Sequence, residues 1–148
     1  MSRRCRQVTR SIGWLGFGLL LLGTPASSAE ADRYPANSLL LLVASWCAPC
    51  HAELANLPAI TRGALPFGTL VVPFDDSLAT RSMLERVPAA QRWQPGRAMQ
   101  RRLMQDVAAG TAGLPFSLGV NGDGEICGSA RQGLDGQSAN ALVARCLR

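Results

Sequence analysis

Residues 46–51 read Trp-Cys-Ala-Pro-Cys-His and follow directly on the apolar run 39–44, Leu-Leu-Leu-Leu-Val-Ala. A short continuous apolar run predicts a strand covered on both faces of a sheet, and the residues from Cys50 onward have a helical pattern. We therefore expect Cys47 at a helix N-terminus, where the helix dipole and unpaired N–H groups stabilise a thiolate. Two cysteines at this spacing form a reversible disulfide, but the same letters also satisfy the Cys-x-x-Cys-His pattern of covalent haem attachment.

The first 29 residues have the composition of a secretory signal peptide. Four arginines and no acidic residue precede the apolar stretch 12–23, and the small-residue segment 24–29 follows it. The apolar stretch is about 12 residues long, against the ~20 needed to span a bilayer. We expect cleavage after Ala29 and a periplasmic protein. An uncleaved N-terminal anchor is the alternative.

Removal of this leader changes the charge of the chain. Of the 15 basic residues 4 leave with it, so 11 remain against 10 acidic residues and the net charge falls from +5 to about +1. A nucleic-acid-binding domain would need a clustered basic face, so we expect no nucleic acid partner. The remaining 119 residues or so make one domain.

The rest of the chain predicts an α/β domain. Residues 30–38 form a lead-in without an element of their own. The predicted strands are 39–45, 68–74, 116–120 and 125–130, and the predicted helices are 50–58, 78–87, 95–110 and 137–147. Pro73 suits an edge strand or a strand end, and Asn-Gly and Asp-Gly at 121–124 predict a β-hairpin.

The order of these motifs resembles the thioredoxin fold. Trp46-Cys47-Ala48-Pro49-Cys50 follows a buried strand, and Gly113-Leu114-Pro115 precedes a β-hairpin about 65 residues later. The continuation Cys50-His51-Ala52-Glu53 is most similar to the TlpA-like branch of exported thiol–disulfide oxidoreductases. The resemblance implies a thioredoxin-like domain over 39–148, with a short mixed sheet of about four strands and helices on both faces.

The resemblance also implies roles for the site residues. Cys47 attacks the partner disulfide and Cys50 resolves the mixed intermediate. Pro115 corresponds to a cis-proline facing the disulfide, so that the backbone of Leu114 binds the partner peptide, and Trp46 shapes the docking surface. A trans-proline that starts a strand is the alternative.

Three further residues near the cysteines are expected to adjust their chemistry. Glu53 follows Cys50 by three residues and should share its helix face, where a carboxylate can relay a proton. Leu41 stands where thioredoxin itself carries a buried acid, which adds weight to Glu53. A solvated helix glutamate is the alternative. His51 and Pro49 are expected to tune the cysteine pKa values, although His51 is equally consistent with an exposed bystander.

Cys127 and Cys146 fall in the second hairpin strand and the last helix, which pack together in this fold. We expect a structural disulfide between them. Two buried thiols or a second redox pair are the alternatives.

The sequence thus predicts an exported thiol–disulfide oxidoreductase that acts on cysteine-containing exported proteins, such as apocytochrome c or copper-site proteins. We expect a monomeric reductant, recharged by a membrane electron donor and needing no metal or organic cofactor. The alternatives are a DsbA-type oxidant, a redox-inactive binding module, or a c-type cytochrome. In the cytochrome, His51 and one of Met83, Met99 or Met104 would ligate the haem iron.

Overall fold

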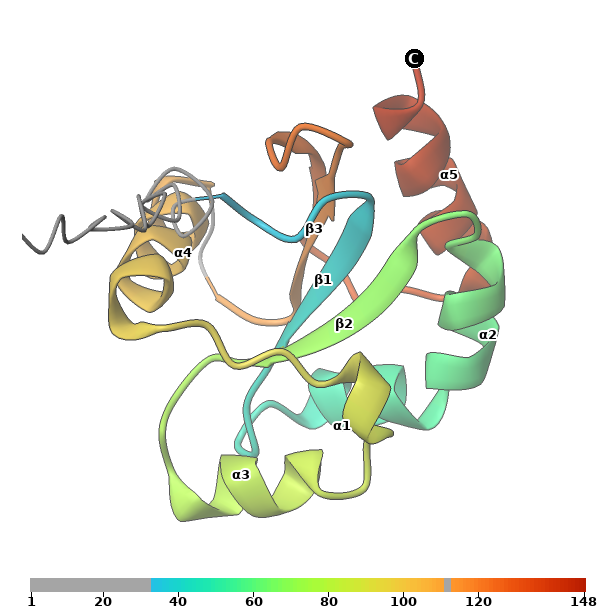
Figure 1. Cartoon of the computed structure of the whole chain (residues 1–148). Helices are drawn as coiled ribbons and strands as arrows, with labels where there is room; N and C mark the ends of the chain where they lie inside the picture. Colours follow the sequence, from blue (N-terminus) through green and yellow to red (C-terminus); the bar gives the residue numbers. More distant parts are fainter. Residues whose placement is uncertain (1–32, 111–112) are drawn as a thin grey trace, which may run out of the picture.

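The computed structural model describes residues 33–110 and 113–148, and the predicted signal peptide lies outside these residues. The described residues form four strands and five α-helices (Figure 1). They are β1 (Ser38–Val43), α1 (Ala48–Ala55), α2 (Leu57–Gly63), β2 (Gly68–Pro73), α3 (Leu78–Leu84), the 3₁₀ turn η2 (Ala89–Gln91), α4 (Arg97–Gly110), β3 (Phe116–Val120), β4 (Ile126–Ala130) and α5 (Gly136–Cys146). None of the described helices has the length and apolar character needed to cross a membrane.

The four strands form one mixed sheet in the order β2-β1-β3-β4. The pairing of β1 with β2 is parallel, whereas β1 with β3 and β3 with β4 are antiparallel. Pro73 is the last residue of β2, and β2 is an edge strand, as the sequence predicts. An edge strand tolerates proline because its outer N–H groups need no partner within the sheet.

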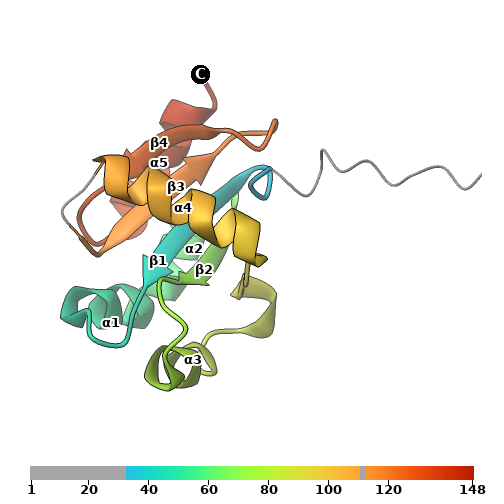
Figure 2. The same ribbon diagram turned by 90° about the vertical axis from the view of Figure 1, so that its left-hand side faces the viewer.

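Strand β1 is buried along its whole length because helices cover both faces of the sheet (Figure 2). Leu39, Leu41 and Val43 point into a core cluster with residues of α1, α2 and α5. Leu40 and Leu42 point to the opposite face, where they pack with the apolar side of α4. The continuous apolar run in the sequence therefore reflects burial on both faces, as in other strands with two covered faces.

The predicted helix after the cysteines is two helices in the structure. Asn56 ends α1 and precedes α2, and Pro58 lies in the first turn of α2. Proline is tolerated there because the first-turn N–H groups have no intrahelical acceptor. The sequence predicted that Pro58 would kink or stop the helix; the interruption lies two residues earlier, at Asn56, and Pro58 lies in the first turn of the second helix.

The two helices between β2 and β3 lie on opposite faces of the sheet. Ser77 caps the N-terminus of α3, and its hydroxyl oxygen accepts a hydrogen bond from the Thr80 N–H at 3.1 Å. Met83 and Leu84 of α3 join the core cluster that contains α1. Helix α4 begins at Arg97, two residues after the predicted start at Pro95.

The lead-in has a packing role that its polar sequence does not indicate. Tyr34 is only 3% exposed and its hydroxyl donates to Asp106 Oδ2 of α4 at 2.6 Å. Its ring lies edge-on to Trp93, with 6.4 Å between the ring centroids. The segment before β1 is therefore fixed to α4.

Candidate active site

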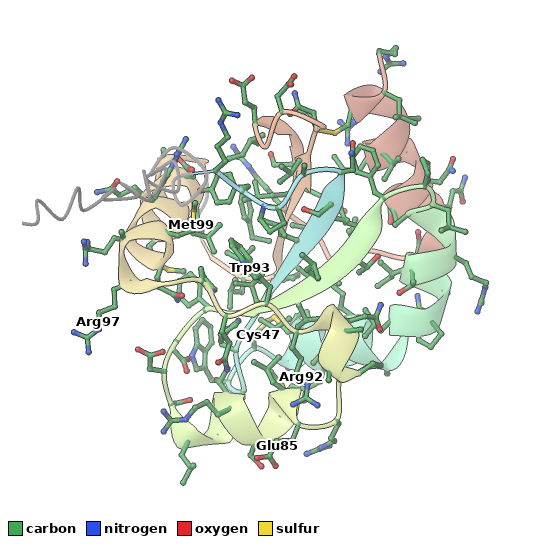
Figure 3. All side chains as sticks on the ribbon, viewed as in Figure 1. Cys47, Glu85, Arg92, Trp93, Arg97 and Met99 are labelled. Atoms are coloured by element: carbon green, nitrogen blue, oxygen red, sulfur yellow. A yellow bond between two sulfur atoms is a disulfide. The ribbon has the colours of Figure 1, made fainter. Side chains whose placement is uncertain are left out.

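Cys47 lies where the chain leaves β1 and enters α1 (Figure 3). It is the N-cap residue of α1, and its sulfur accepts a hydrogen bond from the Cys50 N–H at 3.2 Å. Pro49 lies in the first turn, where a missing N–H costs nothing. The N–H groups and the dipole of α1 are therefore arranged to stabilise negative charge on Cys47 Sγ.

Cys47 and Cys50 are joined by a disulfide, with 5.3 Å between their Cα atoms. Cys50 is fully buried, as expected for the resolving cysteine. Cys47 is also buried, but 4% of its surface is exposed, so it is the more accessible of the two cysteines, as expected for the attacking one. Both cysteines belong to the same core cluster.

The Leu114–Pro115 peptide bond is cis. Pro115 is buried at the start of β3, and Leu114 packs against the core cluster that contains both cysteines. Among the described residues, no hydrogen bond uses the N–H or C=O group of Leu114. The backbone of Leu114 thus keeps the pairing capacity that peptide binding would require.

Glu53 is the buried carboxylate of the site, with only 3% of its surface exposed. Its Oε1 atom accepts hydrogen bonds from the Leu134 N–H at 2.9 Å and from the Ser117 hydroxyl at 3.4 Å, whereas Oε2 is buried without a partner among the described residues. Burial raises the pKa of Glu53, and the hydrogen bonds from Leu134 and Ser117 offset only part of this increase. The alternative of a solvated glutamate is wrong.

Ser117 and Leu134 were not singled out by the sequence analysis. Ser117 pairs with Leu41 across β1 and β3, so its hydroxyl reaches Glu53 from the strand next to the one where thioredoxin carries its acid. Leu134 contributes only its backbone from the loop before α5. A buried serine in an otherwise apolar strand was the one available signal for this contact.

Trp46 is 64% exposed, and its side chain contacts the residues that follow β2. Its indole N–H donates to Asp75 Oδ2 at 2.8 Å, and its ring lies edge-on to Phe74. Desolvation alone would raise the pKa of Asp75, but hydrogen bonds from Ser77, Thr80 and Trp46 lower it. Asp75 therefore remains ionised and fixes the ring beside Cys47.

His51 is exposed on the first turns of α1. Its Nε2 atom lies 2.8 Å from the carbonyl oxygen of Ser45, so Nε2 donates its hydrogen to that carbonyl. This contact ties the ring to the loop between β1 and α1. It also leaves the ring beside a groove between α1 and α3, which has a volume of about 270 Å³.

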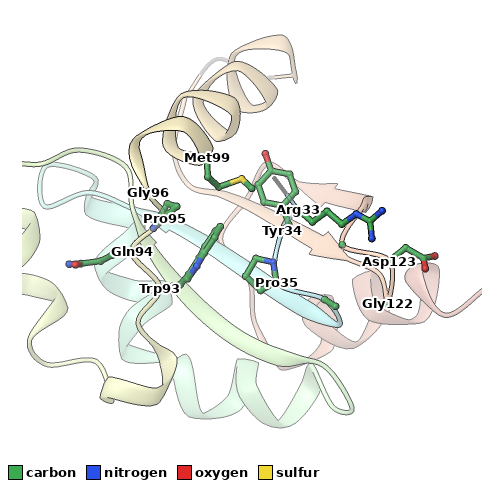
Figure 4. Close-up of a pocket in the computed structure, with 12 residues that line it drawn as sticks. Arg33, Tyr34, Pro35, Trp93, Gln94, Pro95, Gly96, Met99, Gly122 and Asp123 are labelled. Atoms are coloured by element: carbon green, nitrogen blue, oxygen red, sulfur yellow. The ribbon is translucent and has the colours of Figure 1, made fainter. Parts of the chain in front are cut away.

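A larger hollow of about 490 Å³ lies away from the disulfide, between the lead-in and α4 (Figure 4). Tyr34, Trp93 and Met99 line it, with Arg33 and Asp123 at its margin. Apart from Met99, which was considered only as a haem ligand, none of the predicted site residues lines this hollow. It therefore does not contribute to the chemistry of the cysteines.

The other two cysteines, Cys127 and Cys146, form a disulfide between β4 and α5. Gly119 of β3 lies beneath it, and a Cβ atom at this glycine would stand 2.7 Å from Cys146 Sγ. The sulfur atoms thus fill the space that a side chain at position 119 would occupy. Both cysteines are half-buried, and the structural role of their disulfide stays a prediction.

The methionines proposed as haem ligands are divided between the two faces of the sheet. Met99 and Met104 pack on the α4 face, while Met83 packs on the face that carries α1 and the cysteines. His51 lies on α1, so Met99 and Met104 are separated from it by the sheet. Only Met83 lies near His51, and it forms part of the apolar floor of the α1–α3 groove.

Comparison with known proteins gave matches only among solved structures. No family model matches the chain, and no curated protein matches it by sequence. A thioredoxin family thiol:disulfide interchange protein from Chlorobium tepidum is 15% identical over 82% of this chain and 85% of its own, with a TM-score of 0.57. A thioredoxin-related protein from Neisseria meningitidis serogroup B is 20% identical over 84% of this chain and 93% of its own, with a TM-score of 0.56.

A DsbF homologue from Corynebacterium diphtheriae is 18% identical over 77% of this chain and 74% of its own, with a TM-score of 0.54. At these identities the similarity concerns the fold. The strand order, the Cys-x-x-Cys pair at the start of α1 and the backbone matches agree with one another. The chain therefore has the thioredoxin fold, as its sequence predicts.

Proposed function

We propose that this protein is an exported thiol–disulfide oxidoreductase whose redox centre is the Cys47–Cys50 pair. One observation carries the proposal: the disulfide lies at the N-terminus of α1, with Cys47 as the N-cap and its sulfur bonded to the Cys50 N–H. That hydrogen bond and the helix dipole favour the thiolate over the thiol, and the thiolate is the nucleophile in disulfide exchange.

The reaction needs two exchange steps. In the reduced protein, the Cys47 thiolate attacks one sulfur of a partner disulfide, a mixed disulfide forms, and the second partner sulfur leaves as a thiolate that takes a proton from water. Cys50 then loses its proton and attacks Cys47 Sγ, which releases the first partner sulfur. Two electrons pass to the partner, which becomes a dithiol, while the protein becomes a disulfide.

Glu53 is the proton acceptor for Cys50 in this mechanism. Its position three residues after Cys50 puts both side chains on one helix face. Its raised pKa makes the carboxylate a stronger base than an exposed glutamate, and its Oε2 atom has no competing partner among the described residues. A base whose pKa approaches the working pH is the more effective catalyst.

The partner peptide binds along the backbone of Leu114, next to the cis Pro115. Main-chain pairing of this kind accepts many sequences, because side chains do not form the hydrogen bonds. Trp46 forms one wall of the docking surface, where its large exposed ring packs against the partner.

The location is proposed from the sequence, and the direction of transfer from the resemblance to the TlpA-like branch. The leader-like residues 1–29 support export to the periplasm. We assign the protein as a reductant of cysteine-containing exported proteins, recharged by a dithiol donor at the membrane. The similarity to thiol:disulfide interchange proteins is consistent with this assignment.

The test is the reduction of insulin disulfides with dithiothreitol as the final reductant. We expect the wild type to accelerate the reaction, Cys47→Ser to lose all acceleration, and Cys50→Ser to accumulate a mixed disulfide that denaturing gels detect. The double variant Cys127→Ala/Cys146→Ala serves as the control and should keep the wild-type rate. Activity in Cys47→Ser would contradict the proposal, as would a wild type that oxidises reduced partners but reduces none.

A further inference from the structure

A groove separates α1 from α3, two helices that lie side by side in both views of the molecule (Figures 1 and 2). Its volume is about 270 Å³. Leu57, Met83 and Val87 form a floor in which each side chain is 5% exposed. His51 and Arg86 are exposed at its rim. An apolar floor with a few polar groups at the edge is the usual form of a binding site.

Arg86 is the charged group of the groove. It follows the last turn of α3, and its N–H bonds to the carbonyl oxygen of Met83 at 3.3 Å. Among the described residues, no carboxylate forms an ion pair with its guanidinium group. Guanidinium groups bind carboxylates with two parallel hydrogen bonds, so an acidic partner fits this rim.

The groove lies within reach of a peptide bound at Cys47. His51 lines the groove and follows Cys47 by four residues, which is about one helical turn or ~5.4 Å along α1. An extended peptide advances ~3.3 Å per residue, so a residue about two positions from the reacting cysteine reaches the His51 end of the groove, and the residues after it extend along the groove.

We propose that the α1–α3 groove selects partner proteins by the sequence next to their reacting cysteine. An apolar side chain enters the floor above Met83, and a neighbouring carboxylate binds Arg86. The proposal rests on the proposed function, because it concerns the partner of the same disulfide. The backbone contact at Leu114 does not discriminate between partner sequences. The groove would add such a preference.

The pair between Arg86 and a partner carboxylate lies at an exposed rim. Exposed ion pairs of this kind change affinity by roughly twofold to fivefold. Reversal of the charge replaces attraction by repulsion, so we expect about a tenfold change between matched acidic and basic partners.

The experiment uses three fluorogenic peptide disulfides that differ only in two residues beside the cysteine. The residue for the apolar floor and its charged neighbour are Leu and Glu in the first peptide, Leu and Lys in the second, and Ser and Glu in the third. Each is reduced by the wild type and by Arg86→Glu, and kcat and KM are measured separately. Arg62→Glu is the matched control, because Arg62 is an exposed arginine in the last turn of α2 and does not line the groove. Hydroxyethyl disulfide, which is too small to reach the groove, reports the chemistry of the cysteines alone.

We expect the wild type to have the lowest KM for the Leu–Glu peptide, Arg86→Glu to prefer the Leu–Lys peptide, and Arg62→Glu to behave as the wild type. Added salt should reduce the preference for charge but not the preference for leucine over serine. If Arg86→Glu keeps the wild-type order of peptides while hydroxyethyl disulfide is reduced normally, the groove proposal is wrong and the proposed function stands. If the wild type reduces none of the disulfides, both proposals fail.

Discussion

Glu53 shows what a single residue contributes to this site. The carboxyl group is buried beside the helix face of Cys50, and only one of its two oxygens has hydrogen-bond partners among the described residues. A buried carboxylate without full hydrogen bonding is costly when charged, so the folded protein holds the proton of Glu53 more tightly than the unfolded chain does. Burial of the charged carboxylate lowers the stability of the fold, and it also makes Glu53 a stronger base.

We predict that Glu53→Gln separates the effect of Glu53 on stability from its role as a base. Glutamine keeps the acceptor for Leu134 but cannot take a proton, so resolution of the mixed disulfide should slow by about 10²-fold at neutral pH. Stopped-flow measurement of partner release checks this rate. Raising the pH should restore part of it, because hydroxide then deprotonates Cys50.

The stability of the same variant tests the raised pKa of Glu53. Because the folded state binds this proton more tightly, the wild type loses stability as the pH rises from the ordinary pKa of glutamate through the raised pKa. Glu53→Gln should lack this loss, so its urea midpoint should rise relative to that of the wild type across this pH range and keep a constant difference above the raised pKa. A difference between the two midpoints that is constant across this pH range as well would show that the pKa of Glu53 is not raised.

The contacts of Glu53 also mark how far the sequence predicts the site. Cys47, Cys50 and Glu53 lie within seven residues of one another, so helix geometry places them together. The Leu134 N–H comes from 81 positions away and the Trp46–Asp75 bond joins residues 29 apart. Contacts between residues so far apart depend on how the loops pack, and the periodic pattern of the sequence does not predict them.

At the scale of elements, the break between α1 and α2 lets α2 pack closely against α5. Gly63 at the end of α2 lies so near Gly136, the first residue of α5, that a Cβ atom there would overlap the Gly136 carbonyl oxygen. Two glycines therefore set the distance between these helices. No sequence pattern singled out Gly63, because a pattern within one segment does not show which helix it meets.

We predict that Gly63→Ala destabilises the protein by about 1–3 kcal/mol, because backbone atoms must move to admit the methyl group. Gly68→Ala is the matched control, since a Cβ atom at Gly68 has no neighbour within 4 Å. Its effect should stay within about 0.5 kcal/mol. Urea unfolding of both variants measures the free energies. Equal effects would contradict the close approach of α2 and α5.

At the scale of the whole molecule, the two disulfides have different environments. Cys47–Cys50 lies at the end of β1 under the proposed peptide-binding surface, while Cys127–Cys146 ties β4 to α5 at the sheet edge opposite β2. The buried strand β1 and the sheet edge at β2 could be predicted from an apolar run and a proline, and the thioredoxin fold from the resemblance of the motifs around Cys47 and Pro115 to that family. The burial of Tyr34 could not, since it depends on contacts with α4.

We predict that Cys127→Ala/Cys146→Ala loses about 3 kcal/mol of unfolding free energy, because the disulfide closes a loop of about 20 residues in the unfolded chain. Denaturant unfolding measures this loss, and insulin reduction should continue at the wild-type rate. A fall in activity without a fall in stability would instead indicate that the second pair exchanges electrons with the first.

The most direct measurement is a redox titration of both pairs in one protein. The protein is equilibrated in dithiothreitol buffers of known potential, quenched with acid and alkylated, and each cysteine is then assigned by peptide mass spectrometry. We predict that Cys47–Cys50 is reduced as a two-electron couple near the thioredoxin potential of about −270 mV, while Cys127–Cys146 stays oxidised at that potential. A Cys47–Cys50 pair that resists reduction, or a Cys127–Cys146 pair that is reduced first, would contradict the assignment of Cys47 and Cys50 as the redox centre.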